Sequence, residues 1–203
     1  PVEYLFRPKK SIISQREIGI DIPTYSEGLK YVVRQDPDTI FVGEMREKFT
    51  MTAALQAAET GHLVFGSLHT ADTMQAFARI LEFFPREEHD FVRSSLANAL
   101  RGICAQRLLP GAHEKVSLVP ATEVLLNSPT CRDLIRKGQD QDLPSLIAAS
   151  EKEGMHSFTS SLVRLVQEDL VFMDVAKQFA PNADALASSL RGIKTRAETM
   201  IHR

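Results

Sequence analysis

Two short apolar segments in the first third of the chain have the composition of buried strands. The first is "TIFV" (39–42), and the second lies within "HLVFGSLH" (62–69). Uninterrupted apolar residues, many of them β-branched or aromatic, predict strands buried on both faces, as in a parallel sheet. Between them, "FTMTAALQAAETG" (49–61) is rich in helix formers and ends at Gly61, which suits a left-handed cap. This order predicts a strand–helix–strand unit with parallel strands.

Helical patterns lie on both sides of this unit. "TYSEGLKYVVRQ" (24–35) carries Thr24 and Glu27 at capping-box spacing ahead of an apolar stripe. "DTMQAFARILEFF" (72–84) ends before a proline. Residues 87–109 have apolar side chains at positions 91, 92, 96, 99, 100, 103 and 104, a spacing that predicts one core-facing helix.

The last part of the sequence predicts a different organisation. "EKVSLVPATEVLL" (114–126) predicts one further strand or hairpin piece, in which Pro120 favours an edge or a bend. Everything beyond Asn127 has the pattern of short helices. We therefore expect an α/β core with a mostly parallel sheet in residues 1–126, followed by a small all-helical domain in residues 127–203.

Composition narrows the classes of function. The chain has 203 residues, with 24 Lys and Arg against 26 Asp and Glu, so it carries no bulk positive charge for binding nucleic acid. No apolar segment is long enough to cross a bilayer. Cys104 and Cys131 stand too far apart for a CxxC motif, which favours a reducing compartment. Because the sequence begins at Pro1 without a methionine, we expect a fragment or a processed chain.

Two histidines border the second predicted strand. His62 and His69 would lie roughly 20 Å apart in an extended segment that rises about 3.3 Å per residue, so they cannot share a metal ion. A lone histidine is most often structural, and we leave His62 between a structural role and a role in binding. His69 differs because the carboxyl ends of parallel strands meet at one sheet edge, which places it near Glu44.

Glu44 follows the first predicted strand after a single glycine. Several apolar residues followed by an acid form the Walker B pattern of nucleotide hydrolases, in which the acid serves Mg²⁺ or the attacking water. A carboxylate at the end of a buried strand is costly unless it binds a cation or orients water. The alternative is an ordinary α/β protein with an incidental acid at the end of a strand.

Longer motifs indicate a family. "RQDPDTIFVGEMRE" followed by "AAETGHLVFGSLHTAD" resembles the Walker B and His boxes of secretion ATPases, in particular the hexameric type IV pilus retraction ATPases of the PilT family. "PVEYLFRPKKSIISQRE" is similar to the segment that includes the end of their Asp box. The resemblance continues through "RILEFFP", "SLANALRGICAQRLLP" and "SPTCRDLIRKG".

The resemblance implies a RecA-like P-loop NTPase core that hydrolyses ATP with Mg²⁺ at a subunit interface. It implies a homo-hexamer in the cytoplasm, peripheral to the inner membrane, that pulls pilin subunits out of a pilus. The implied partners are the inner-membrane pilus platform protein and an accessory retraction ATPase. Catalytically silent oligomerisation or docking modules, type II secretion or assembly motors and type IVB secretion ATPases are the alternatives. The type II and assembly motors usually carry a four-cysteine zinc module, which two cysteines cannot build.

The same resemblance implies roles for individual residues. Glu3 matches the Asp-box glutamate, a general base toward the attacking water. Glu44 matches the Walker B glutamate, which serves Mg²⁺ through water, and His69 matches the sensor of the γ-phosphate.

Three arginines also match family positions. Arg34 and Arg46 flank the first strand and would couple the core to the nucleotide or a neighbouring domain, unless they are a solvated pair on loop ends. Arg79 is either a third such arginine or an ordinary charge on a helix surface.

One expected motif is missing. No part of the sequence matches G-x-x-x-x-G-K-[ST], the loop that cradles the phosphates, which in the family precedes the Asp box. The family's N-terminal PAS-like domain has no counterpart either. We therefore expect these 203 residues alone to bind ATP weakly and not to hydrolyse it.

Overall fold

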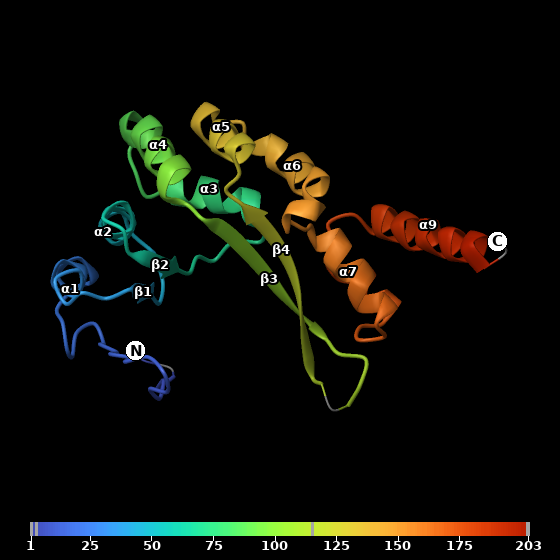
Figure 1. Ribbon diagram of the computed structural model, residues 1–203, viewed down its shortest axis with the longest axis horizontal. Helices are drawn as coiled ribbons and strands as arrows, with labels where there is room; N and C mark the ends of the chain where they lie inside the picture. The colour runs from blue at the N-terminus through green and yellow to red at the C-terminus, as the bar shows by residue number, and fades with distance from the viewer. Residues whose placement is uncertain (1, 3, 115, 202–203) are drawn as a thin grey trace. The chain divides into compact units, whose positions relative to one another are not determined.

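The structure, a computed structural model, describes residues 2, 4–114 and 116–201, with side chains up to Gly192. It is a mixed α/β protein (Figure 1). The α-helices are α1 (Tyr25–Val32), α2 (Lys48–Glu59), α3 (Thr73–Leu81), α4 (His89–Ala99), α5 (Pro129–Lys137), α6 (Leu143–Ala149), α7 (Phe158–Gln167), α8 (Met173–Phe179) and α9 (Ala183–Ile201). The strands are β1 (Thr39–Val42), β2 (Leu63–Gly66), β3 (Gly102–Pro110) and β4 (Leu118–Leu126), and the 3₁₀ turns are Arg86–Glu88, Asp140–Asp142 and Glu151–Glu153.

The described chain forms two compact units. The first comprises Pro1–His69 and Ile80–Ala99, and the second comprises Thr70–Arg79 and Leu100–Arg203. The boundary predicted at residue 126 falls at the end of β4, inside the second unit, and the division into a core and a helical domain stays a prediction. No helix within the described residues is long and apolar enough to span a membrane.

The predicted strand–helix–strand unit is confirmed in the first unit. β1 and β2 pair in parallel with Thr39 opposite Leu63 and Val42 opposite Gly66, and α2 connects them. α2 ends as the sequence predicts, because Gly61 has a φ of +101° and its N–H donates to the carbonyl of Ala58 at 3.1 Å. The order of the elements and the end of the helix therefore agree with the sequence pattern.

The start of α1 also follows its sequence signal. The Thr24 hydroxyl accepts a hydrogen bond from the backbone N–H of Glu27 at 3.2 Å, as an N-cap residue should. Leu29 of this helix packs in a small core with Ile40, Val42 and Ala57, which joins α1 and α2 to one face of β1.

Burial of the β1–β2 sheet on both faces is not found among the described residues. Ile40 and Val42 face the core, while Phe41 is 68% exposed and its neighbour Phe65 in β2 is 53% exposed. The prediction of two buried faces was therefore wrong for this part of the chain, since an apolar segment reveals that a strand can be buried but not what covers it.

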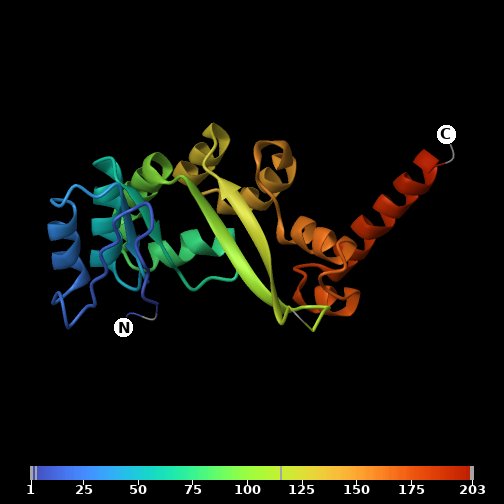
Figure 2. The same ribbon diagram turned by 60° about the horizontal axis from the view of Figure 1, so that its bottom comes forward.

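The single helix predicted over residues 87–109 is also wrong. α4 ends at Ala99, and Gly102–Pro110 form β3, which pairs antiparallel with β4 along its whole length (Figure 1 and Figure 2). The described sheets therefore comprise one parallel and one antiparallel pair, so the sheet is not mostly parallel. Pro120 lies within β4 opposite Leu108. Among the described strands β4 pairs with β3 alone, and an edge strand of this kind tolerates a proline.

The β3–β4 hairpin supplies one face of the main core of the second unit. Ala105 and Leu109 of β3 and Val119 and Ala121 of β4 pack against α7, α8 and α9. Phe158, Leu162 and Leu186 are among the buried residues contributed by these helices. The short helices predicted after residue 127 are confirmed; α7 and α8 lie against the hairpin, and α9 packs on these two helices.

Candidate functional site

The ends of β1 and β2 stay joined beyond the last paired residues. The N–H of Met45 donates to the carbonyl of Ser67 at 3.0 Å, and the Ser67 hydroxyl donates to the carbonyl of Gly43. Glu44 stands between these two linked residues, and His69 follows Ser67 by two positions. These two bonds hold the strand ends together beyond the last paired residues and bring both side chains to the same edge.

Glu44 is the centre of a small charged group at this edge. Its Oε2 lies 2.5 Å from an Arg46 guanidinium nitrogen, and its Oε1 lies 3.0 Å from Nε2 of His69. The Glu44 side chain is 23% exposed, whereas His69 is 84% exposed and Arg46 is 75% exposed. The predicted proximity of Glu44 and His69 is thus present, and Arg46 joins them on the other carboxylate oxygen.

Electrostatics keep the Glu44 carboxyl ionised. The hydrogen bond from Arg46 is the main cause that lowers the pKa of Glu44, and the charges of Arg46 and His69 add to it against a smaller opposing effect of desolvation. The same contact raises the pKa of Arg46. Glu44 is therefore a carboxylate at neutral pH, which can accept hydrogen bonds or attract a cation but has no proton to donate.

The donor set at Glu44 fits a magnesium ion held through water. Mg²⁺ prefers oxygen ligands and commonly uses one or two carboxylates together with waters and substrate phosphates. Arg46 and His69 occupy part of the acceptor capacity of Glu44, which favours contact through water over direct ligation. Among the described residues, no group of three or more histidine, cysteine, aspartate or glutamate side chains could hold a metal ion.

Replacing Arg46 by alanine tests these electrostatics. Because Arg46 is the main cause of the lowered pKa, the Arg46→Ala variant should titrate Glu44 at a higher pH than the wild type. Because the pKa of Glu44 is lowered in the folded state, the ion pair stabilises the fold fully above the ordinary pKa of 4.5. This stabilisation is lost as the pH falls through the lowered pKa. Carboxyl ¹³C NMR of the labelled chain measures the midpoint.

Arg34→Ala is the matched control for this titration. Arg34 is exposed and precedes β1, whereas Glu44 follows it. The midpoint of Glu44 should therefore remain at the wild-type pH in Arg34→Ala. Equal midpoints in wild type and Arg46→Ala would contradict the assigned ion pair.

His62 lies at the other end of β2, where it makes hydrogen bonds with residues near the end of α2. Its Nδ1 lies 3.0 Å from the carbonyl of Ala57 and 3.2 Å from the hydroxyl of Thr60, and its backbone N–H donates to the same Ala57 carbonyl at 3.2 Å. Because a carbonyl can only accept, Nδ1 carries the proton when this side-chain bond forms. These contacts support the structural alternative for His62 and separate it from the group around Glu44.

The other candidate residues are not brought to this group by the described contacts. Arg34 lies in the loop after α1, where its N–H donates to the carbonyl of Tyr31. Arg79 lies in the last turn of α3 and belongs to the second unit. Glu3 lies outside the described residues. The proposed roles of all three stay predictions.

Two contacts of the site were not predicted from the sequence, and they differ in how much signal the sequence carried for them. The spacing of Glu44 and Arg46 is the i, i+2 relation that places two side chains on the same side of an extended segment, so their contact could have been anticipated. Ser67 is different, because its bond to Gly43 depends on the register between two strands. Such a contact is visible only after the strands are paired.

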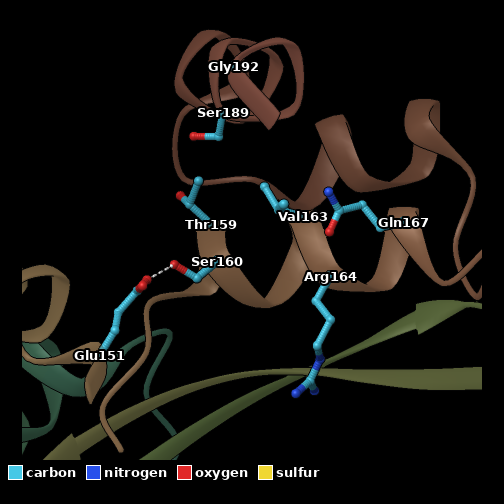
Figure 3. Close-up of a pocket in the computed structure, with 8 residues that line it drawn as sticks. All are labelled: Glu151, Thr159, Ser160, Val163, Arg164, Gln167, Ser189 and Gly192. Atoms are coloured by element: carbon cyan, nitrogen blue, oxygen red, sulfur yellow. Dashed lines mark hydrogen bonds between the residues drawn. The ribbon is translucent and has the colours of Figure 1, made fainter. Parts of the chain in front are cut away.

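A pocket in the second unit is unrelated to these residues. It has a volume of about 480 Å³ and lies between α7 and α9 (Figure 3). Polar side chains make up most of its lining, among them Arg164 and Glu151, whose carboxylate accepts a hydrogen bond from the Ser160 hydroxyl at 2.6 Å. None of the predicted site residues lines it.

The chain is similar in sequence to proteins of type II and type IV secretion and of pilus retraction. The profile of the family described as "Type II/IV secretion system protein" matches residues 1–184. A "Twitching motility protein" of Neisseria gonorrhoeae is 37% identical over 187 residues, which are 92% of this chain and 50% of that protein. The "Type IV pilus retractation ATPase PilT" of Pseudomonas aeruginosa is 37% identical over 182 residues, 89% of this chain and 52% of that protein.

A solved structure agrees with the sequence matches. The crystal structure described as "the Pilus Retraction Motor PilT and Bound ADP" superimposes with a TM-score of 0.79 and 39% identity, over 91% of this chain and 51% of that chain. This chain therefore spans about half the length of the relatives it matches.

Proposed function

The chain belongs to the family of type II/IV secretion system proteins, and from this premise we propose that it is the part of a motor ATPase that carries the Walker B and His boxes. The motor hydrolyses ATP and uses the energy for retraction of a type IV pilus. The observation that carries the proposal is the Glu44 carboxylate, held between Arg46 and His69 at the carboxyl ends of two parallel strands. The relatives named for twitching motility and for pilus retraction support the cellular role.

In this proposal each residue at the edge has a separate task. Glu44, ionised beside Arg46, orients the attacking water and would hold Mg²⁺ through water. His69, exposed and held on the other carboxylate oxygen, reaches the γ-phosphate. When bound, Mg²⁺ would neutralise the charge that develops on the phosphate oxygens. Glu3 is assigned the part of general base by resemblance.

The remaining parts of the proposal follow from the family. The core is RecA-like and is followed by a helical domain from residue 127. Six copies form the motor, with ATP between neighbouring subunits and with Arg34, Arg46 and Arg79 as candidate contacts to nucleotide or to the adjacent domain. The motor works at the cytoplasmic face of the inner membrane with the platform protein and an accessory retraction ATPase as partners.

Hydrolysis in the longest natural protein that contains these residues tests the proposal. We expect ATP turnover that falls by on the order of 10²-fold or more when Mg²⁺ is chelated and returns when Mg²⁺ is restored, because the ion neutralises the reacting phosphates. Phosphate release measures the rate.

The 203 residues alone serve as the comparison. They contain no G-x-x-x-x-G-K-[ST] sequence and should hydrolyse ATP far more slowly than the longer protein. An inactive longer protein that still oligomerises would favour the silent docking module instead.

A further inference from the structure

Arg107 of β3 makes contacts with three separate parts of the second unit. Its Nε and one terminal nitrogen donate to the carbonyl of Ala71 at 3.4 and 3.1 Å, and its other terminal nitrogen donates to the carbonyl of Phe179 at 2.8 Å. The guanidinium carbon also lies 4.3 Å from the ring centroid of Phe158. One half-buried side chain therefore joins the loop before α3, the end of α8 and the start of α7.

Glu123 of β4 holds the next part of the same loop. A single oxygen of its carboxylate accepts hydrogen bonds from the backbone N–H of Thr73 at 3.1 Å and from the Thr73 hydroxyl at 2.7 Å. Thr73 begins α3 and is only 1% exposed. A carboxylate at the first turn of a helix satisfies a free N–H group and interacts favourably with the helix dipole.

The two charged residues act from one face of the hairpin. Arg107 is paired with Ala121, and Glu123 is paired with Ala105, so the arginine and the glutamate are diagonal neighbours on the face that bears the core. From this face they fix the backbone at Ala71 and Thr73.

The loop that Arg107 and Glu123 hold begins directly after His69. Ala71 follows His69 by two positions, and Phe179 is the last residue of α8. We propose that Arg107 is a positioning residue that ties the backbone directly after His69 to the carboxyl end of α8, with Glu123 securing the same loop at Thr73. A displacement of α8 would therefore change the position of His69. The inference rests on the proposed function, because it assigns a consequence to the phosphate contact of His69.

The chemistry of arginine explains why this residue type suits the position. The planar guanidinium offers five donors in a fixed arrangement and can stack on an aromatic ring, so it can hold two carbonyls and the Phe158 ring together. A lysine keeps the charge but has one compact ammonium group, which cannot reach both carbonyls in the same geometry. Arg107→Lys is therefore a conservative variant that should fold and yet lose the link.

Hydrogen exchange on the 203-residue chain tests the physical link. In Arg107→Met we expect the amides of residues 71–75 and of residues 179, 180, 182 and 183 to exchange about tenfold faster or more, because charge-assisted bonds at both carbonyls are lost. Arg101→Met, at an exposed arginine just before β3, is the matched control and should leave both segments at the wild-type rate. Unchanged exchange in these segments, or equal acceleration in every part of the chain, would overturn the inference.

Nucleotide binding by the longer protein tests the link to His69. We expect Arg107→Lys to weaken binding of a slowly hydrolysed ATP analogue about tenfold relative to ADP, because only the triphosphate carries the γ-phosphate that His69 contacts. A purely structural role would weaken both nucleotides equally. Arg101→Lys should keep the wild-type ratio.

The outcomes separate this inference from the proposed function. A wild-type protein that binds neither nucleotide would refute the proposed function and the role of His69 together. Normal wild-type binding with an unchanged ratio in Arg107→Lys would refute the positioning role of Arg107 alone.

Discussion

Replacing Glu44 by glutamine in the longer protein should lower ATP turnover by on the order of 10²- to 10³-fold, the range found when one preorganised electrostatic group is removed from an active site. Glutamine has nearly the shape of glutamate but no charge. It leaves Arg46 without its ion-pair partner. One of its two terminal groups is an NH₂ group, which cannot accept a hydrogen bond from Arg46 or His69 as a carboxylate oxygen does. The orientation of water and the attraction for Mg²⁺ are then both weakened.

Steady-state phosphate release measures this effect, and nucleotide binding is measured beside it. Glu59→Gln is the control, because Glu59 is an exposed acid at the far end of α2 from Glu44. The control should keep the wild-type rate. If Glu44→Gln retained that rate while Mg²⁺ remained essential, the role assigned to Glu44 would be wrong.

Truncation of Leu109 should have the largest effect on stability. Leu109 of β3 is completely buried and packs in the core that the hairpin forms with α7, α8 and α9. Removing a buried leucine side chain takes apolar area out of the core and leaves a cavity. We therefore expect Leu109→Ala to lower the free energy of unfolding by about 2–5 kcal/mol.

Leu108 provides a matched control at the adjacent position. It is the same residue type in the same strand, but it points to the other face and is 49% exposed. Leu108→Ala should change the free energy of unfolding by about 0.5 kcal/mol or less, as is usual for surface positions. Urea titration followed by circular dichroism measures both variants, and equal losses would contradict the assigned faces of β3.

Part of the candidate site could be predicted because its geometry is local or follows from the parallel pairing. Once β1, α2 and β2 are recognised, the carboxyl ends of the strands must meet, and Glu44 and His69 follow those ends. The contact between Glu44 and Arg46 is likewise a short-range relation. The sequence does not assign a role to His62, because its bond to Ala57 depends on how the chain turns after α2.

The error at residues 102–110 has a clear physical cause. Apolar residues at positions 100, 103 and 104 continue the helical spacing of α4, but Ile103, Ala105, Arg107 and Leu109 also alternate as strand residues do. The choice between the two patterns is made by pairing with residues 118–126 across the hairpin. Because non-local hydrogen bonds override local preference, no window of sequence around β3 contains the answer.

The family resemblance, the strand–helix–strand unit, the caps at Thr24 and Gly61 and the meeting of Glu44 with His69 could all be inferred from the sequence alone. These depend on residues that are close in the chain or on the fixed geometry of parallel strands. The packed chain was needed to show that β3 is a strand, which sheet faces are covered, and that Arg107 and Glu123 secure the loop after His69. Those features join residues far apart in the sequence, so they exist only once the chain has packed.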